Sequence, residues 1–368
     1  MPRFVGDANF RHGGPDRRPN RVGVLVANLG TPEAPTAPAV RRFLAEFLWD
    51  PRIVEAPRWL WWLALHGLIL RVRPARSAHA YRQIWTPEGS PLMLHSRAIA
   101  SALEQELARD LDPVVALGMT YGAPSLPTAL AQLREANVRR IIVLPLYPQY
   151  SATTTACVFD RVTRELQRWR WVPELRFIHG WHDEPAYIEA LSAAIEEYWR
   201  ACRLQPRGRL LFSFHGVPRR YLLAGDPYHC FCQKTARLVA ARLGLRDDEW
   251  SVSFQSQVGR EEWLRPYTDE WLIEWARRGG KHVSVVCPGF ATDCLETLEE
   301  IALRNRDAFL KNGGETYHYV PALNAGSSQI ALLAALVRRH AAGWTTAPAA
   351  SEALAESRRR ALQMGAAD

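Results

Sequence analysis

Two stretches of the chain share one pattern: VLVANLGTP at residues 24–32 and LLFSFHGVP at residues 210–218. In each, an apolar run leads into a Gly-x-Pro turn. Short apolar runs bounded by turn signals are typical of strands that are buried on both faces. The two stretches begin 186 residues apart, about half of the 368-residue chain. The sequence therefore predicts two similar halves that divide near residues 203–208.

Similar apolar runs occur at residues 114–119, 141–146 and 283–287, and helical patterns lie between the runs. Alternating strands and helices are typical of a doubly wound α/β fold with parallel sheets. Ligands of such sheets bind beyond the carboxyl ends of the strands. His215 stands at such an end, so we expect a ligand site near it.

The composition is that of an ordinary globular protein, with a formal net charge of +8, 48% hydrophobic residues and 23% charged residues. Residues 1–21 contribute +3 and residues 338–368 contribute +2, so the body of the chain is nearly neutral. We therefore expect no nucleic-acid partner. The sequence has no secretory signal and no uninterrupted apolar run of about 18 residues. Six cysteines are too few for a disulfide scaffold, and we expect a cytoplasmic protein.

One segment, RWLWWLALHGLILRVR at residues 58–73, is unusually apolar and has a basic residue at each end. It contains Trp59, Trp61 and Trp62. Two interpretations of this segment stay open. It is either a buried helix or an apolar lip that binds a large flat ligand or dips into a bilayer surface.

Several common catalytic motifs are absent. The chain has no G-x-x-x-x-G-K-[ST] and no G-x-G-x-x-G motif, so no nucleotide cofactor is expected. The H-E-x-x-H and G-x-S-x-G motifs are absent too, which argues against a zinc protease of that type and against the usual serine hydrolase.

His215 directly follows an apolar run and precedes Gly216, which predicts an accessible imidazole on a rigid element. A neutral imidazole can ligate iron or accept a proton near neutral pH. A structural or merely exposed histidine has the same sequence pattern. The residues alone leave both interpretations open.

The segment VVCPGFATDCLETLEEIALRN at residues 285–305 predicts the end of a strand and then a helix that Thr292 or Asp293 caps. Glu296 and Glu300 are four residues apart and therefore share one helix face. They form either a solvated acidic face or a ladder of carboxylates that passes a divalent cation towards a site.

Cys230 and Cys232 form a C-x-C pair next to His229. A closed zinc site usually takes four ligands in two spaced pairs, and an iron–sulfur cluster takes four thiolates. The remaining four cysteines are scattered along the chain. We therefore expect the main function to need no cluster, and Cys230 and Cys232 are the candidate ligands if one is present.

Six blocks of sequence occur in a recognisable order along residues 21–338. They are VANLGTPEAPT (26–36), YRQIWTPEGSPL (81–92), LPLYPQYSATTT (144–155), LLFSFHGVPRRYLLAGDPY (210–228), FQSQVGREEWLRPYTDEWL (254–272) and CPGFATDCLETLEEI (287–301). In these blocks the chain resembles the ferrochelatase family, and above all its proteobacterial branch. The resemblance implies a lyase that inserts ferrous iron into protoporphyrin IX and releases two protons, the last step of haem synthesis.

The resemblance also implies a fold and a site. It implies two lobes, at residues 21–204 and 205–340, each with a four-stranded parallel sheet, and a porphyrin cleft between them. His215 and Glu296 match the family's catalytic residues, and His215, Glu296 and Glu300 match its metal-binding residues. Four further residues match positions that line the cleft: Tyr81, Ser90, Tyr147 and Trp263.

The two ends of the chain fall outside these lobes. We expect residues 1–20 to form a disordered basic tail and residues 341–368 to form a C-terminal tail. The chain also departs from the family at two positions. Cys294 stands where many members have a second histidine, and Thr120 stands where an arginine is common.

The resemblance implies Fe²⁺ and protoporphyrin IX as substrates. It leaves a 2Fe–2S cluster open, because some bacterial members hold one on internal cysteines, and the expectation of no cluster rests on the ligand count above. Two other functions share the cleft or the fold: a cobalt chelatase of corrinoid synthesis, and a non-catalytic porphyrin or haem carrier. The carboxylates beside an accessible histidine favour the enzyme over the carrier. We expect a monomer that contacts the inner face of the cytoplasmic membrane peripherally.

Overall fold

The computed structural model describes residues 4–5, 21–204, 207–259, 261–344 and 351–365. Most of the predicted N-terminal tail, residues 1–20, lies outside these ranges. The exception is Val5, whose N–H donates to the carbonyl oxygen of Arg168 at 2.7 Å. Val5 thereby forms a short parallel bridge with Trp169.

The chain forms two four-stranded sheets, and every strand pair in them is parallel. The first sheet has the order β2-β1-β3-β4 and the second has the equivalent order β6-β5-β7-β8. The predicted doubly wound α/β fold with two similar halves is confirmed. The strands are β1 (Val22–Asn28), β2 (Val114–Met119), β3 (Arg140–Pro145), β4 (Glu174–Phe177), β5 (Arg209–His215), β6 (Trp250–Gln255), β7 (His282–Val286) and β8 (Thr316–Val320).

The apolar runs in the sequence predict five of these strands, and the three that they miss lie at sheet edges. β1 is buried along its whole length, whereas β4 has no fully buried residue. β6 and β8 are each partly exposed. An edge strand needs apolar side chains only where it faces the core, so it lacks a continuous apolar run.

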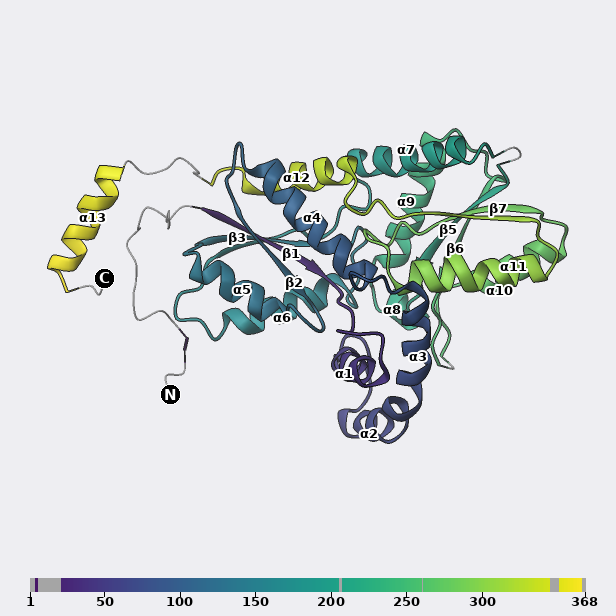
Figure 1. Ribbon diagram of the computed structural model, residues 1–368, viewed down its shortest axis with the longest axis horizontal. Helices are drawn as coiled ribbons and strands as arrows, with labels where there is room; N and C mark the ends of the chain where they lie inside the picture. Colours follow the sequence, from purple (N-terminus) through teal and green to yellow (C-terminus); the bar gives the residue numbers. More distant parts are fainter. Residues whose placement is uncertain (1–3, 6–20, 205–206, 260, 345–350, 366–368) are drawn as a thin grey trace.

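Helices cover both faces of the two sheets, and a separate arm projects from them (Figure 1). We define the arm as residues 37–84. It consists of α1 (Ala37–Leu48), α2 (Arg58–Ala64), the π-helix η1 (Leu65–Ile69) and α3 (Leu70–Ile84). The helices on the sheets are α4 (Pro91–Leu107), α5 (Leu126–Glu135), α6 (Thr155–Leu166), α7 (Pro185–Ala201), α8 (Arg219–Leu223), α9 (Tyr228–Arg242), α10 (Thr268–Arg277), the π-helix η2 (Glu296–Asn305), α11 (Arg306–Lys311) and α12 (Ser327–Ala341). A last helix, α13 (Ser351–Gln363), follows residues 345–350.

The two halves share one apolar core. A single cluster of buried residues includes Val24 of β1, Leu103 of α4, Phe212 of β5 and Leu333 of α12. Helix α12 follows the second sheet along the chain but packs on α4, which belongs to the first half. Figure 1 shows α12 lying over the first sheet beside α4. This crossing joins the two halves through a shared core.

The apolar segment at residues 58–73 is mostly exposed, so the interpretation as a buried helix is wrong for most of it. The exposed fractions of Trp59 and Trp62 are 71% and 51%. Trp61 differs, because its Nε1–H donates to the carbonyl oxygen of Leu48 at 2.7 Å. No helix in the described part of the chain is long and apolar enough to cross a membrane.

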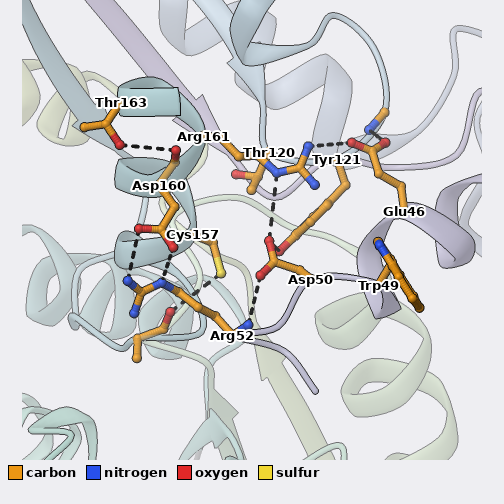
Figure 2. Close-up of polar contacts among 12 residues, drawn as sticks. Glu46, Trp49, Asp50, Arg52, Thr120, Tyr121, Cys157, Asp160, Arg161 and Thr163 are labelled. Carbon is orange, nitrogen blue, oxygen red and sulfur yellow. Dashed lines mark hydrogen bonds and ion pairs between the residues drawn. The ribbon is translucent and has the colours of Figure 1, made fainter. Parts of the chain in front are cut away.

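Ion pairs fix the base of the arm to the first half (Figure 2). Arg52 donates from Nε and Nη2 to the two carboxylate oxygens of Asp160 in α6, at 2.5 and 3.0 Å. In the second ion pair the basic residue is on α6: Arg161 donates from Nη1 to Glu46 Oε1 of α1 at 2.6 Å. The second oxygen of Glu46 accepts from the Gly122 N–H at 2.8 Å. Two pairs of opposite polarity thus join α6 to the end of α1.

A buried tyrosine lies between these pairs. The Tyr121 hydroxyl donates to Asp50 Oδ2 at 3.0 Å, and the Arg161 guanidinium lies 4.5 Å from the centre of the Tyr121 ring. Tyr121 is fully buried, and this burial raises the pKa of its hydroxyl. The hydroxyl therefore stays protonated and donates to Asp50, and the arm is held by charged and neutral hydrogen bonds together.

We predict that Arg161→Met lowers the free energy of unfolding by about 2 kcal/mol, since it leaves Glu46 and Asp50 without their cation. The matched control is Arg42→Met, because Arg42 pairs with Glu33 at a site where both side chains are about two-thirds exposed. Loss of such an exposed pair costs about 0.5 kcal/mol. Urea denaturation of the two variants measures the difference. Equal losses in the two variants would contradict the anchoring role of Arg161.

Candidate functional site

His215 is the last residue of β5 and lies opposite Gln255, the last residue of β6. Its Nδ1 lies 2.7 Å from the carbonyl oxygen of Gly216. A carbonyl oxygen can only accept, so Nδ1 carries the proton and Nε2 of the neutral ring has a free lone pair. The rings of Trp263 and Phe290 lie 6.3 and 6.5 Å from the imidazole. Trp263, one of the predicted cleft residues, is therefore a neighbour of His215.

The acidic segment begins differently from the sequence prediction. The helix starts at Leu295 and continues as the π-helix η2, and no side chain caps it. The prediction that Thr292 or Asp293 caps this helix is wrong. The Asp293 carboxylate instead accepts from Tyr319 Oη at 2.5 Å, Asn324 Nδ2 at 2.8 Å and Thr297 Oγ1 at 2.9 Å. These bonds fix the segment before η2, and π-helical turns are frequent at functional sites.

Glu296 and Glu300 both lie in the interior of the site, so neither forms a solvated acidic face. Glu296 lines a cavity, and the Glu300 side chain is only 12% exposed. Both oxygens of Glu300 accept hydrogen bonds from Ser256. Burial raises the pKa of the Glu300 carboxyl, although Ser256, Arg304 and His215 act in the opposite direction. Glu300 is therefore close enough to His215 for their charges to interact.

The cavity beside Glu296 has a volume of about 70 Å³ and lies where the arm meets both halves. Tyr81 and Ser90, two of the predicted cleft residues, line it together with Arg73, Cys294 and Glu296. Ser90 Oγ accepts from Thr31 Oγ1 at 2.9 Å. Pockets that hold drug-sized ligands have volumes of roughly 300–1,000 Å³. A large ligand therefore enters this site only if the walls move apart.

Tyr147, the fourth predicted cleft residue, lies just outside the cavity lining. Its hydroxyl is buried and has no hydrogen-bond partner among the described residues. Burial raises the pKa of this hydroxyl, and Cys157 and Glu296 act in the same direction. Tyr147 thus lies within electrostatic reach of Glu296.

Arg73 is a site residue that the sequence analysis missed. It lines the cavity from α3, and within the described ranges its guanidinium makes no hydrogen bond or ion pair. Burial lowers the pKa of Arg73, and the nearby charge of Glu296 opposes this. A sequence signal exists, because Arg73 precedes Tyr81 by eight residues, little more than two helical turns on one face.

The cysteine pair does not form a binding site. Cys230 is exposed and Cys232 is fully buried, so the two thiols point to different sides of α9. Among the described residues, no group of three or more His, Cys, Asp or Glu side chains is arranged to hold a metal ion. This statement includes the predicted metal-binding residues His215, Glu296 and Glu300, which are neighbours without a preformed shell of ligands.

Cys294 and Thr120, the two departures from the family pattern, occupy different environments. Cys294 lies in the cavity wall next to Glu296, and burial raises the pKa of its thiol. Thr120 is buried, and its Oγ1 donates to the carbonyl oxygen of Asn28 at 3.0 Å. Thr120 therefore serves the backbone of β1 and supplies no positive charge to the site.

Comparison with known proteins agrees with this fold. The sequence profile described as Ferrochelatase matches residues 21–341. The ferrochelatase of Nitrosococcus oceani is 55% identical over 99% of both chains, and that of Thioalkalivibrio sulfidiphilus is 52% identical over 100% of both. Among solved structures, SirB from Bacillus subtilis with Fe³⁺ has a TM-score of 0.52 at 13% identity, and covers 88% of this chain and 96% of its own. That likeness concerns the fold alone, whereas the full-length relatives and the profile show that the chain belongs to the ferrochelatase family.

Proposed function

We propose that His215, Glu296 and Glu300 carry the chemistry by which this ferrochelatase inserts Fe²⁺ into protoporphyrin IX. The enzyme is a lyase of haem synthesis, and its reaction replaces two pyrrole protons by one metal ion. The observation that carries the proposal is the Nε2 lone pair of His215 close to the interior carboxylate of Glu300, with Glu296 four residues before it on η2. The membership of the family also sets aside the cobalt chelatase and the carrier.

His215 is the proton acceptor in this proposal. Its Nε2 takes a proton from a pyrrole nitrogen, and the imidazolium that forms is stabilised by the Glu300 carboxylate. Glu296 reaches into the cavity and offers Fe²⁺ an oxygen ligand as the metal approaches the ring. Glu300, four residues further along η2, first binds the incoming Fe²⁺ and passes it to Glu296. Imidazole and carboxylate both suit Fe²⁺, and they also accept other divalent ions.

Arg73, Tyr81 and Ser90 bind the porphyrin carboxylates in this proposal. Arg73 is a partly buried cation that makes no hydrogen bond or close ion pair in the described part of the chain, and Tyr81 and Ser90 lie in the same wall. A charge-assisted pair with a carboxylate is strong in such a setting. Protoporphyrin carries two propionates, so this wall orients the ring for the metal.

The arm also brings the enzyme to a membrane surface, where the poorly soluble porphyrin is found. Helix α2 has no buried residue, and the apolar patch continues beyond it. The patch consists of Trp59, Leu60, Trp62, Leu63, Leu68 and Val72, all at least half exposed. Buried apolar area at roughly 25 cal/mol per Å² gives reversible attachment. We propose peripheral contact with the inner face of the cytoplasmic membrane, made by a monomer.

His215→Ala removes the proton acceptor, and we expect the rate of Fe²⁺ insertion to fall by about 10²–10⁴-fold. Binding of protoporphyrin, followed by fluorescence, should change little. The control is His282→Ala, because His282 is the first residue of β7 and lies at the amino ends of the strands, whereas His215 lies at the carboxyl ends. Anaerobic assays of both variants measure the difference. A His215→Ala enzyme with more than a tenth of the normal rate would refute the proposed role.

Arg73→Met removes the positive charge from the cavity wall, and we expect KM for protoporphyrin to rise by about 10–100-fold. The KM for Fe²⁺ should stay near its normal value. Arg71→Met is the matched control, because Arg71 lies on the same helix and is exposed. Similar KM values for porphyrin in the two variants would show that Arg73 does not bind a carboxylate.

Trp59→Ser with Trp62→Ser should reduce the fraction of protein that floats with vesicles containing anionic lipid. The reason is the loss of two large side chains that face outward. Trp171→Ser is the control, since Trp171 is also 51% exposed but follows α6 and lies outside the arm. Equal flotation of the double variant and the control would exclude the arm as the membrane contact.

A further inference from the structure

The last residue of β6 and the residue after it hold η2 at two points. Gln255 donates from Nε2 to the backbone carbonyl oxygen of Glu296 at 2.8 Å. Its own Oε1 accepts from Ser213 Oγ at 2.8 Å, so the amide is fixed in orientation. The next residue, Ser256, donates hydrogen bonds to the side chain of Glu300. Gln255 and Ser256 therefore bind both acidic residues of the site, Glu296 through its backbone and Glu300 through its side chain.

Ser256 gives both of its donors to Glu300. Its N–H lies 2.8 Å from Oε1, and its Oγ lies 2.5 Å from Oε2. Among the described residues, the charged group that pairs with Glu300 is Arg304, whose Nη2 is 3.9 Å from Oε2, beyond hydrogen-bond distance. The two bonds from Ser256 therefore decide where the Glu300 carboxylate points.

The backbone of Ser256 has an unusual left-handed conformation. Its φ is +67°, a left-handed value that residues other than glycine adopt rarely. This conformation turns the N–H and the side chain towards the same carboxylate. Backbone strain of this kind persists where the surrounding structure holds it, and it is concentrated at functional sites. A serine that served only as a turn residue needs no such double contact.

We propose that Ser256 is a positioning residue that acts through Glu300 and thereby sets the approach of Fe²⁺ to Glu296 and His215. The inference rests on the roles proposed above for Glu300 and His215. Both donors of Ser256 are bound to Glu300, so in this proposal Ser256 acts on the metal through the carboxylate. Its loss should therefore alter the use of metal and spare the binding of porphyrin.

Ser256→Ala removes the hydroxyl bond to Glu300, and we expect KM for Fe²⁺ to rise by about 5–10-fold with little change in kcat. KM for protoporphyrin should stay constant. Ser256→Thr keeps the hydroxyl and should restore KM for Fe²⁺ to within about twofold. Ser256→Gly also lacks the hydroxyl but suits the positive φ, so it tests the same bond in a chain without backbone strain. Ser251→Ala, near the start of β6, is the matched control.

A double-mutant cycle with Glu300→Gln shows whether Ser256 acts through Glu300. We expect Glu300→Gln to raise KM for Fe²⁺, and Ser256→Ala to add nothing in that background. Additive effects, or a rise in KM for protoporphyrin in Ser256→Ala, would overturn the inference and leave the role of Glu300 intact. An unchanged KM for Fe²⁺ in Glu300→Gln alone would overturn the proposed role of Glu300 and this inference with it.

Discussion

The parallel pairing of β5 with β6 is the constraint on which the site depends. In this register His215 lies opposite Gln255, so both residues leave the sheet at the same carboxyl edge. Strand β7 lies on the other side of β5 and leads directly into the segment that begins η2. This arrangement places three features at one edge of the sheet: the His215 imidazole, the Gln255 amide that binds η2, and η2 itself. A shift of one residue between β5 and β6 would turn His215 and Gln255 to opposite faces.

The carboxylates at this edge are stabilised by different partners. Asp293 is buried and accepts hydrogen bonds from three neutral side chains. Glu300 accepts both of its close bonds from Ser256, with Arg304 farther away. Neutral donors hold a carboxylate in place without cancelling its charge, whereas a close arginine pairs with it directly. The site therefore keeps negative charge available for a cation in a place that is largely closed to water.

Burial explains what the sequence could and could not predict. The runs at β1 and β5 are apolar without interruption because both faces of these central strands are covered, so the fold class follows from them. Glu296 and Glu300 are predictable as a pair from their spacing. The contacts of η2 with Gln255 and Ser256 are not, because they join residues that are distant in sequence. Arg73 was not predicted as a site residue for a similar reason. Helix α3 contains several arginines, and only the packing of the arm shows which of them lines the cavity.

The return of α12 to the first half bears on how the protein is made. Ile99 and Leu103 of α4 belong to the same buried cluster as Leu333 and Val337 of α12. A ribosome completes α4 more than two hundred residues before it completes α12, which ends at Ala341. During that interval the part of α4 that packs on α12 has no native cover, although domains commonly fold in order of synthesis. The two halves repeat one architecture, yet the nascent first half reaches its final packing only after nearly the whole chain has emerged.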